Sequence, residues 1–203
     1  SISSLLVGVT SAGMATGNVA LTGFAGLTAG ALSMAAGEYV SVSAQADVEA
    51  ADLERERIAL EEDPDYELEE LAEGLENRGV DAALAVKVAT QMTDHDALGA
   101  HAREELGMFG LAGQANPLQA AGASALAFAL GGAFPLIAAL VAPAGYALMA
   151  IAVTAVLALA LLGGGGARLG GAPLRSAIIR AVVWGALAMA VTAALGQAFH
   201  VAV

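Results

Sequence analysis

The sequence predicts an all-α polytopic membrane protein, with five transmembrane helices and an acidic, cytosolic helical domain inserted between helices 2 and 3. Two observations support this fold class. The 62 residues from Leu106 to Ala167 contain no Asp, Glu, Lys or Arg, although about 20 apolar residues are enough to cross a bilayer. All 20 acidic residues lie between Glu38 and Glu105, so the chain is apolar, then strongly acidic, then apolar again.

The composition excludes several classes of protein. Of the 203 residues, 58% are hydrophobic and only 14% are charged, whereas a soluble domain usually carries about 25% charged residues. The mean hydropathy of +0.71 also excludes a disordered chain, which needs low hydrophobicity. The absence of cysteine excludes disulfides and thiolate metal sites. The net charge of −12 argues against a nucleic-acid partner, because phosphate binding needs a basic surface.

Proline and glycine divide the apolar sequence into five predicted spans. The first is short, and we expect it to be the end of a truncated helix 1. The third begins at Asn116-Pro117, since proline is well tolerated in a first helical turn. The run GGGGARLGGAP, residues 163–173, is predicted to be a flexible loop. The spans are expected at about residues 1–17, from 19 to 38 and beyond, from 117 to the turn at 143–145, at 146–162 and at 174–203.

These spans define three predicted regions. Residues 1–46 hold transmembrane helices 1 and 2, residues 47–107 form the acidic domain, and residues 115–203 hold helices 3–5. Arg168 and Arg175 flank the link between helices 4 and 5, and cytoplasmic loops retain Lys and Arg. The acidic domain falls on the same side of the membrane, so we expect it in the cytosol.

The acidic domain is predicted to be a helical hairpin on a stalk. Residues 39–62 contain no Gly or Pro, so span 2 should continue as one helix until Pro64. Shorter helices should follow, each begun by an aspartate cap: residues 66–77 after Asp63 or Asp65, residues 82–93 after Asp81, and residues 96–106 after a restart at Asp94. Apolar residues at helical spacing are expected to form a thin core or to contact a partner subunit: Leu53, Ile58, Leu60, Leu68, Leu71, Leu75, Leu84, Val88 and Met92.

Carboxylates are dense on single faces of these helices. Three groups share a face at helical spacing: Glu49, Asp52 and Glu56; Glu67 and Glu70; and Glu69, Glu73 and Glu76. Like charges at this spacing destabilise a helix by about 0.2–0.5 kcal/mol per pair, and bound divalent cations would offset that cost. The sequence therefore favours a metal-binding domain, with a solvated acidic face as the alternative for any single glutamate.

One histidine narrows the choice of metal. His101 stands three and four residues before Glu104 and Glu105, which places imidazole and carboxylate on one helical face. This donor set suits Fe²⁺, Mn²⁺ or Zn²⁺ better than Ca²⁺. The Glu-x-x-His pattern of di-iron bundles is missing, since position 98 is Leu. The alternative is a surface histidine that caps a backbone carbonyl.

A candidate ion path lies on span 2. Met34 and Glu38 are four residues apart and share a helical face. A carboxylate near membrane depth is costly and is a functional candidate by default, and a thioether is a ligand for borderline transition metals. The alternatives are bundle packing for Met34 and a headgroup-level position for Glu38.

Several motifs together resemble the vacuolar iron transporter family, in a prokaryotic form. They are AGLTAGALSMAAGEYVSVSAQADVEAADLERER, EEDPDYELEELAEGLENRGV, HDALGAHAREELG and PLQAAGASALAFALGGAFPL. The resemblance covers essentially the whole chain, and SMAAGEYVSVSAQ at 33–45 is its most specific part. It implies a homodimer in a prokaryotic cell membrane, with five helices per subunit, that moves Fe²⁺ and sometimes Mn²⁺ out of the cytosol against protons.

The resemblance also implies roles for individual residues. Met34 would line the ion path, and the cytosolic ligands would include Glu56, Glu67, Glu70 and Glu105. There are three departures from the family pattern. Where the family pattern implies a further carboxylate of the cytosolic set, this chain has Ala59. His101 occupies a position that is Met in some relatives. The family also has an Asp-Gly pair early in its first helix, and we expect that pair just before this sequence begins.

The leading hypothesis is a divalent metal transporter, with Fe²⁺ or Mn²⁺ as its cargo and no prosthetic group. Its metal ligands would be drawn from Glu56, Glu67, Glu70, His101, Glu104 and Glu105, and its path would use Met34 and Glu38. A membrane-anchored metal buffer or sensor is the alternative, and a carboxylate ferroxidase is a third. No nucleophile–base arrangement, phosphate loop or dinucleotide fingerprint is present, so we do not expect an enzyme.

Overall fold

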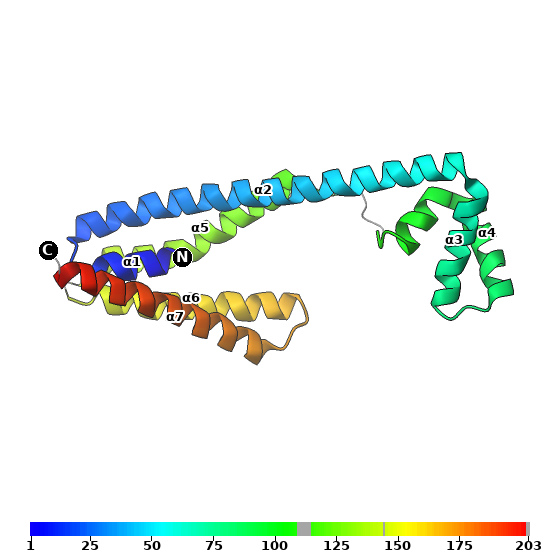
Figure 1. Cartoon of the computed structure of the whole chain (residues 1–203). Helices are drawn as coiled ribbons and strands as arrows, with labels where there is room; N and C mark the ends of the chain where they lie inside the picture. Colours follow the sequence, from blue (N-terminus) through cyan, green and yellow to red (C-terminus); the bar gives the residue numbers. More distant parts are fainter. Residues whose placement is uncertain (109–114, 144, 202–203) are drawn as a thin grey trace. The chain divides into compact units, whose positions relative to one another are not determined.

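A computed structural model gives the fold of residues 1–108, 115–143 and 145–201. In these ranges the chain forms seven α-helices and no strand (Figure 1). They belong to two compact units. One unit combines Ser1–Gly37 with Ala121–Val203, and the other is Glu38–Ala120. The long helix α2, Thr16–Glu62, contributes its first half to one unit and its second half to the other.

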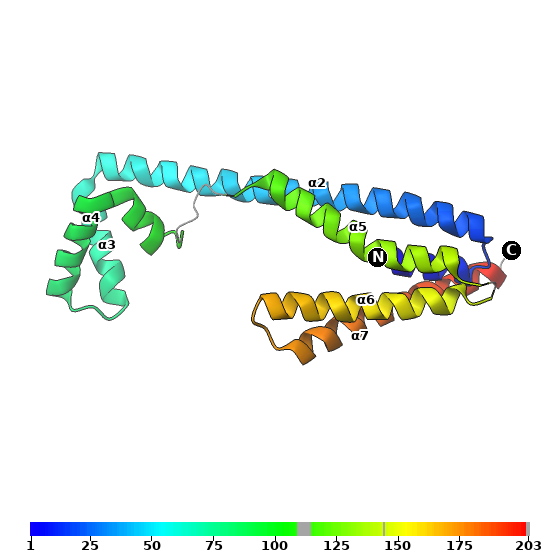
Figure 2. The ribbon, with the colours of Figure 1, turned by 180° about the vertical axis from the view of Figure 1, so that it is seen from behind.

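The first unit is an apolar helical bundle. Besides the start of α2, it contains α1 (Ile2–Ser11), α5 (Pro117–Val141), α6 (Ala147–Leu169) and α7 (Leu174–Val201). The helix α1 packs against α6 and α7, and α6 and α7 form a hairpin that is visible from both sides (Figures 1 and 2). The predicted start of α5 is confirmed, because Asn116 Oδ1 accepts a hydrogen bond of 3.0 Å from the Gln119 amide.

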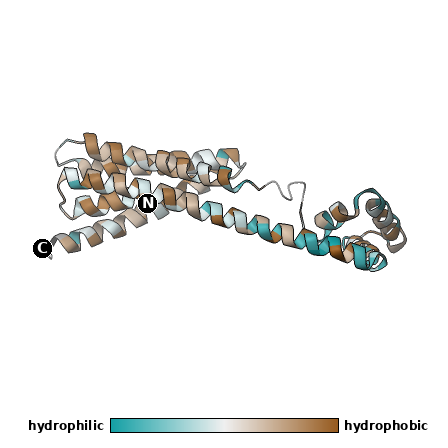
Figure 3. Ribbon diagram, turned by 90° about the horizontal axis from the view of Figure 1, so that it is seen from above, coloured by the Kyte–Doolittle hydropathy of each residue, from teal (hydrophilic) through white to brown (hydrophobic). Residues whose placement is uncertain are grey.

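Within the described ranges, four helices are long and apolar enough to cross a membrane: α2, α5, α6 and α7. Hydrophobic residues dominate α5, α6 and α7, whereas hydrophilic residues are frequent in the second half of α2 and in the two helices after it, where they alternate with hydrophobic ones (Figure 3). The predicted all-α class is therefore confirmed, as is the capacity to span a bilayer. The count of five spans stays a prediction, because α1 has only 10 residues and a span needs about 20. The predicted end of the last span at Val203 lies outside the described residues.

Small residues let the apolar helices approach closely. A Cβ added to Gly23 would lie 2.5 Å from Leu136 Cδ1, and one added to Gly30 would clash with the ring of Phe128. The core of the unit includes Leu6 and Ile151, which are both fully buried. Glycine at these positions removes the side chains that would hold the helices apart.

The prediction of a flexible loop at residues 163–173 is wrong for its first half. The helix α6 continues through Gly163–Gly166 to Leu169, and the chain turns only at Gly170 and Gly171. The physical reason is helix packing, because a Cβ on Gly163 would lie 2.9 Å from Ala181 Cβ on α7. The glycines permit a close α6–α7 contact whose packing outweighs their low helix propensity.

The second unit contains the acidic helices. They are α3 (Pro64–Asn77) and α4 (Ala82–Glu104), which pack against each other. The predicted caps are present: Asp63 accepts from the Tyr66 amide at 3.2 Å, and Asp81 accepts from the Ala83 amide at 3.1 Å. Gly79 has a φ of +95°, in the left-handed region that favours glycine after a helix end.

The predicted break between the last two acidic helices is a kink inside α4. Asp96 has extended backbone angles (φ −165°, ψ 83°), and its side chain accepts a hydrogen bond of 3.0 Å from the Gly99 amide. The restart is therefore capped by Asp96 and not by Asp94. Asp94 and Asp96 are two residues apart, which is less than one helical turn. A difference of this size is typical of helix boundaries predicted from a capping residue.

The core of the acidic unit is thin, as predicted. It is formed by Leu71, Ala72, Ala89 and Ala100, with Leu68, Leu75 and Met92 packed around them. Ile58 and Leu84 are exposed and so lie outside this core; for these two residues, contact with a partner subunit stays a prediction. Three of the four core residues are alanines, which let α3 and α4 approach more closely than leucine would.

Candidate metal site

Three helices of the acidic unit bring two carboxylates and one imidazole together. Glu56 comes from the last turns of α2, Glu67 from the first turn of α3, and His101 from α4 after its kink. One ligand atom from each side chain lies within 4.8 Å of the other two. Glu105, one turn after His101, adds a fourth polar group. We call these four residues the Glu/His cluster.

The distances within the Glu/His cluster centre on one ring nitrogen. His101 Nδ1 lies 2.7 Å from Glu105 Oε1, 2.9 Å from Glu56 Oε1 and 3.8 Å from Glu67 Oε2. In a metal centre with bonds of about 2.1 Å, neighbouring ligand atoms at right angles are about 3 Å apart. The cluster therefore has about the spacing that a first-row divalent cation requires.

The cluster is buried although it is charged. The His101 side chain is fully buried, and the Glu67 and Glu56 side chains are 9% and 11% exposed. The local fold explains this burial: the Asp63 cap and Pro64 turn the chain so that α3 starts beside the end of α2. Ala100, next to His101, is packed in the core with Leu71. Burying carboxylates is costly unless a partner compensates for the lost water.

Several polar atoms of the cluster lack a hydrogen-bond partner. Among the described residues, His101 Nδ1, His101 Nε2 and Glu56 Oε1 are buried and accept or donate no hydrogen bond. The short distances from Nδ1 to the carboxylates therefore do not come with hydrogen-bond geometry. Unsatisfied buried polar groups are rare in proteins and need an explanation. A metal ion would satisfy the carboxylate oxygen and one ring nitrogen together.

The electrostatics of the cluster favour neutralisation. Burial raises the pKa of Glu67, and the negative charges of Glu56 and Glu70 raise it further. Burial also raises the pKa of Glu105, although His101 opposes that shift. Both carboxylates are thus in a site that favours a bound proton or cation over a free negative charge.

The remaining two candidate ligands lie differently. Glu70 is exposed on α3, one turn after Glu67, and acts on the cluster through its charge. Glu104 instead forms an ion pair with Arg78, whose Nη2 also donates to the Glu104 backbone oxygen at 2.9 Å. Of the two carboxylates predicted beside His101, Glu105 lies 2.7 Å from its Nδ1, whereas Glu104 pairs with Arg78. The sequence carries no signal for the Arg78 partner, which is 26 residues away.

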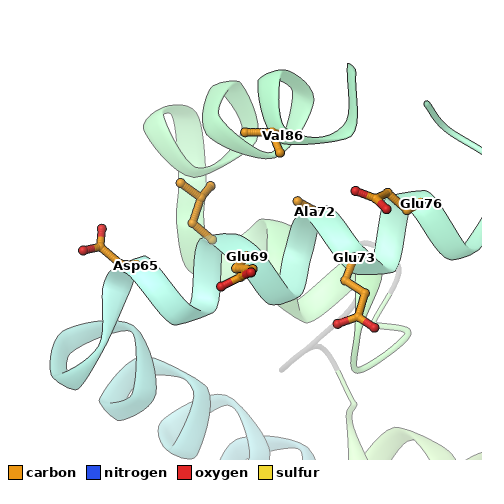
Figure 4. A pocket seen from close by; sticks show the side chains of 7 residues that line it. Asp65, Glu69, Ala72, Glu73, Glu76 and Val86 are labelled. Carbon is orange, nitrogen blue, oxygen red and sulfur yellow. The ribbon is translucent and has the colours of Figure 1, made fainter. Parts of the chain in front are cut away.

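A second group of acids on α3 does not converge. Asp65, Glu69, Glu73 and Glu76 line a cavity of about 510 Å³ together with Leu68, Ala72 and Val86. Their carboxylates point in different directions (Figure 4). This arrangement is that of a solvated acidic face, the alternative considered for individual glutamates.

Comparison with known proteins decides the family. The model of the VIT family matches residues 1–197. A vacuolar iron transporter from Acanthamoeba castellanii is 46% identical over 181 residues, which cover 89% of this chain and 69% of that relative.

The chain belongs to the VIT family.

Plant members of the VIT family are similar over almost the whole chain. Vacuolar iron transporter homolog 1 of Oryza sativa is 36% identical over 193 residues, covering 95% of this chain and 65% of the relative. Vacuolar iron transporter homolog 3 of Arabidopsis thaliana is also 36% identical over 193 residues, covering 72% of the relative. VIT family members are transporters and not enzymes, and this chain is an integral membrane protein.

The candidate path residues of this VIT family chain lie on α2. Met34 and Glu38 are separated by one helical turn, and both side chains are exposed on the helix. Met34 is 44% exposed. A thioether and a carboxylate on one exposed face are available to an ion or to a neighbouring helix.

Proposed function

We propose that this VIT family chain moves Fe²⁺, and secondarily Mn²⁺, out of the cytosol by proton antiport. The observation that carries the proposal is the Glu/His cluster, whose buried imidazole and carboxylate atoms have no hydrogen-bond partner among the described residues. The similar proteins from Acanthamoeba castellanii and Oryza sativa are named for vacuolar iron transport. The cation is cargo, so the cluster acts as a capture site and not as a permanent cofactor site.

The chemistry of the cluster favours a borderline divalent metal. Glu56, Glu67 and Glu105 supply hard oxygen donors, and His101 supplies an imidazole. Ca²⁺ and Mg²⁺ prefer sites built only from oxygen, whereas Fe²⁺ and Mn²⁺ accept mixed nitrogen and oxygen ligands. Glu70 adds negative potential nearby. Glu104 stays outside this ligand set, because Arg78 already neutralises it.

The membrane part of the proposal completes the route. Residues 47–107 form a cytosolic metal-binding domain, residues 1–46 hold helices 1 and 2, and residues 115–203 hold helices 3–5. Met34 and Glu38 line the ion path along α2, where the thioether discriminates against Mg²⁺ and Ca²⁺. Two copies of the chain assemble as a homodimer, and protons move in the opposite direction to the metal.

Flux measurements test this function. The chain is reconstituted in liposomes with a pH gradient, and uptake of Fe²⁺ and Mn²⁺ is followed with an enclosed dye. We expect Met34→Ala to abolish uptake, and Glu67→Gln to reduce it about tenfold by weakening capture. Glu73→Gln is the matched control, because Glu73 lies on the same helix but outside the Glu/His cluster. Uptake that persists in Met34→Ala would contradict the proposed route.

A membrane-anchored metal buffer is the second candidate. The compactness of the acidic unit favours it, because such a unit can bind ions without a path through the bilayer. Binding in calorimetry without flux in liposomes would support the buffer. Flux that depends on both Met34 and Glu67 would support the transporter.

A further inference from the structure

An unpaired arginine lies inside a helix that can span the membrane. Arg180 is exposed on α7, six residues after Leu174 and so about 9 Å along the helix. Its unit contains no acidic side chain at all, because residues 1–37 and 106–203 have none. No ion pair involves Arg180 within the ranges that the structure describes. A charge at such a position needs a partner, since burial in lipid without one is costly.

A groove between α6 and α7 lies beside this arginine. Its volume is about 570 Å³, and Arg180 and Trp184 line it together with a floor of small residues. The floor includes Gly163 and Gly166 of α6 and Ala177 of α7. Part of this floor is a tight contact, because a Cβ on Gly163 would lie 3.3 Å from the Ala177 oxygen. At Gly166, in contrast, an added Cβ would meet nothing within 4 Å, so the groove is open there.

The charges near the groove all have one sign. Arg168, Arg175 and Arg180 are the only charged residues after position 105; Arg168 and Arg175 flank the turn of the α6–α7 hairpin, and Arg180 lies further along α7. Trp184 follows Arg180 by one helical turn, and tryptophan is enriched at the membrane interface. The groove thus combines a positive charge with an otherwise apolar lining on a helix pair that can span a membrane.

We propose that this groove binds an anionic phospholipid. The Arg180 guanidinium holds the headgroup phosphate, for which its planar donors are well suited. An acyl chain lies on the glycine and alanine floor and contacts the Trp184 ring. The apolar floor favours a lipid over a free anion, because only a lipid has a chain to cover it. Basic pockets between membrane helices are a recurrent site for anionic headgroups.

The single tryptophan of the chain makes the proposal measurable. Trp184 is the one Trp among the 203 residues, so its fluorescence reports on the groove alone. The full chain is reconstituted in two vesicle preparations with the same mixture of phosphatidylglycerol and phosphatidylcholine. In one preparation the phosphatidylglycerol has brominated acyl chains, and in the other the phosphatidylcholine has them; bromine quenches tryptophan fluorescence. We expect the quenching to indicate that phosphatidylglycerol binds about fivefold more tightly than phosphatidylcholine, the scale expected for one basic side chain at an anionic headgroup.

Two pairs of variants assign that preference to the groove. Arg180→Gln should reduce the fivefold preference to about one, whereas Arg175→Gln, which loses the same charge outside the lining, should keep it. Gly166→Leu should fill the open floor and lower quenching by both lipids. Gly165→Leu is its control, because Gly165 also has open space around it but does not line the groove.

Three results would overturn the proposal. Equal quenching by both brominated lipids in the wild-type chain would mean that the groove has no preference for an anionic headgroup. Loss of the preference on adding inorganic phosphate, but not chloride at equal ionic strength, would assign Arg180 to a free anion. A Trp184 that neither lipid can quench would indicate that a second copy of the chain covers the groove.

Discussion

Glu67 is held in surroundings that disfavour its negative charge. Its side chain is 9% exposed, and Glu56 and Glu70 are close enough to raise its pKa. In the metal-free protein this carboxylate therefore opposes folding, and it becomes favourable only when a cation binds. Metal sites commonly lower the stability of the empty protein in this way.

A single substitution separates the cost of the buried Glu67 charge in the metal-free chain from the contribution of Glu67 to metal binding. Glu67→Gln should raise the thermal midpoint of the metal-free chain by about 2–4 °C, corresponding to about 1 kcal/mol, because a buried charge and its repulsion are removed. The same change should weaken Mn²⁺ binding about tenfold in calorimetry.

The control for this prediction lies on the same helix. Glu73→Gln removes an exposed charge outside the Glu/His cluster, so it should change neither the midpoint nor the affinity appreciably. A Glu67→Gln chain that is less stable than the wild type without metal would show that Glu67 is a structural residue.

At the scale of single residues, the sequence could indicate which types of ligand to expect but not which would meet. Glu56 and His101 are 45 positions apart in the sequence, and only the kink at Asp96 and the turn at Pro64 bring them within 2.9 Å. Helical spacing predicts Glu104 and Glu105 equally well as neighbours of His101. The structure separates them because Glu104 pairs with Arg78, and no local sequence pattern reveals a pairing between residues so far apart in the chain.

At the scale of elements, the sequence predicts helix ends well where they depend on neighbouring residues, and poorly where they depend on packing against another helix. The caps Asp63 and Asp81 are correct because a cap depends on its own turn and the next few residues. The glycine run of α6 was misassigned because its helical state depends on α7. Four consecutive glycines are unfavourable in an isolated helix, and the compensating contact appears only in the folded hairpin.

The second prediction tests that explanation within the glycine run. Gly163→Ala should destabilise the chain by about 1–3 kcal/mol, because its Cβ would lie 2.9 Å from Ala181 Cβ and force the helices apart. Gly165→Ala should be neutral or stabilising by up to about 1 kcal/mol, since its Cβ meets nothing within 4 Å and alanine favours the helix. Thermal midpoints in detergent measure both, and equal effects would contradict the packing explanation.

At the scale of the whole molecule, the division of charge matters most. Residues 38–105 carry 20 acidic and five basic residues, a net formal charge of −15, whereas the rest of the chain carries three arginines and no acid. This division was evident from the sequence, and it follows that the apolar unit and the acidic unit respond differently to pH. The acidic unit attracts cations from a distance, and we expect its Glu/His cluster to bind them with an affinity that depends on pH.

The last prediction concerns that response to pH. Because the folded-state pKa values of Glu67 and Glu105 are raised, their contribution to stability is complete below the ordinary carboxyl pKa of about 4.3 and is lost as pH rises through the raised values. Metal affinity should change in the opposite sense, because protons leave the same carboxylates over that range. The stabilisation conferred by Mn²⁺, measured as a shift in thermal midpoint, should therefore grow from about pH 4 upward. Its slope should be shallower in Glu67→Gln and unchanged in Glu73→Gln, and a slope common to all three chains would mean that these carboxylates do not bind the metal.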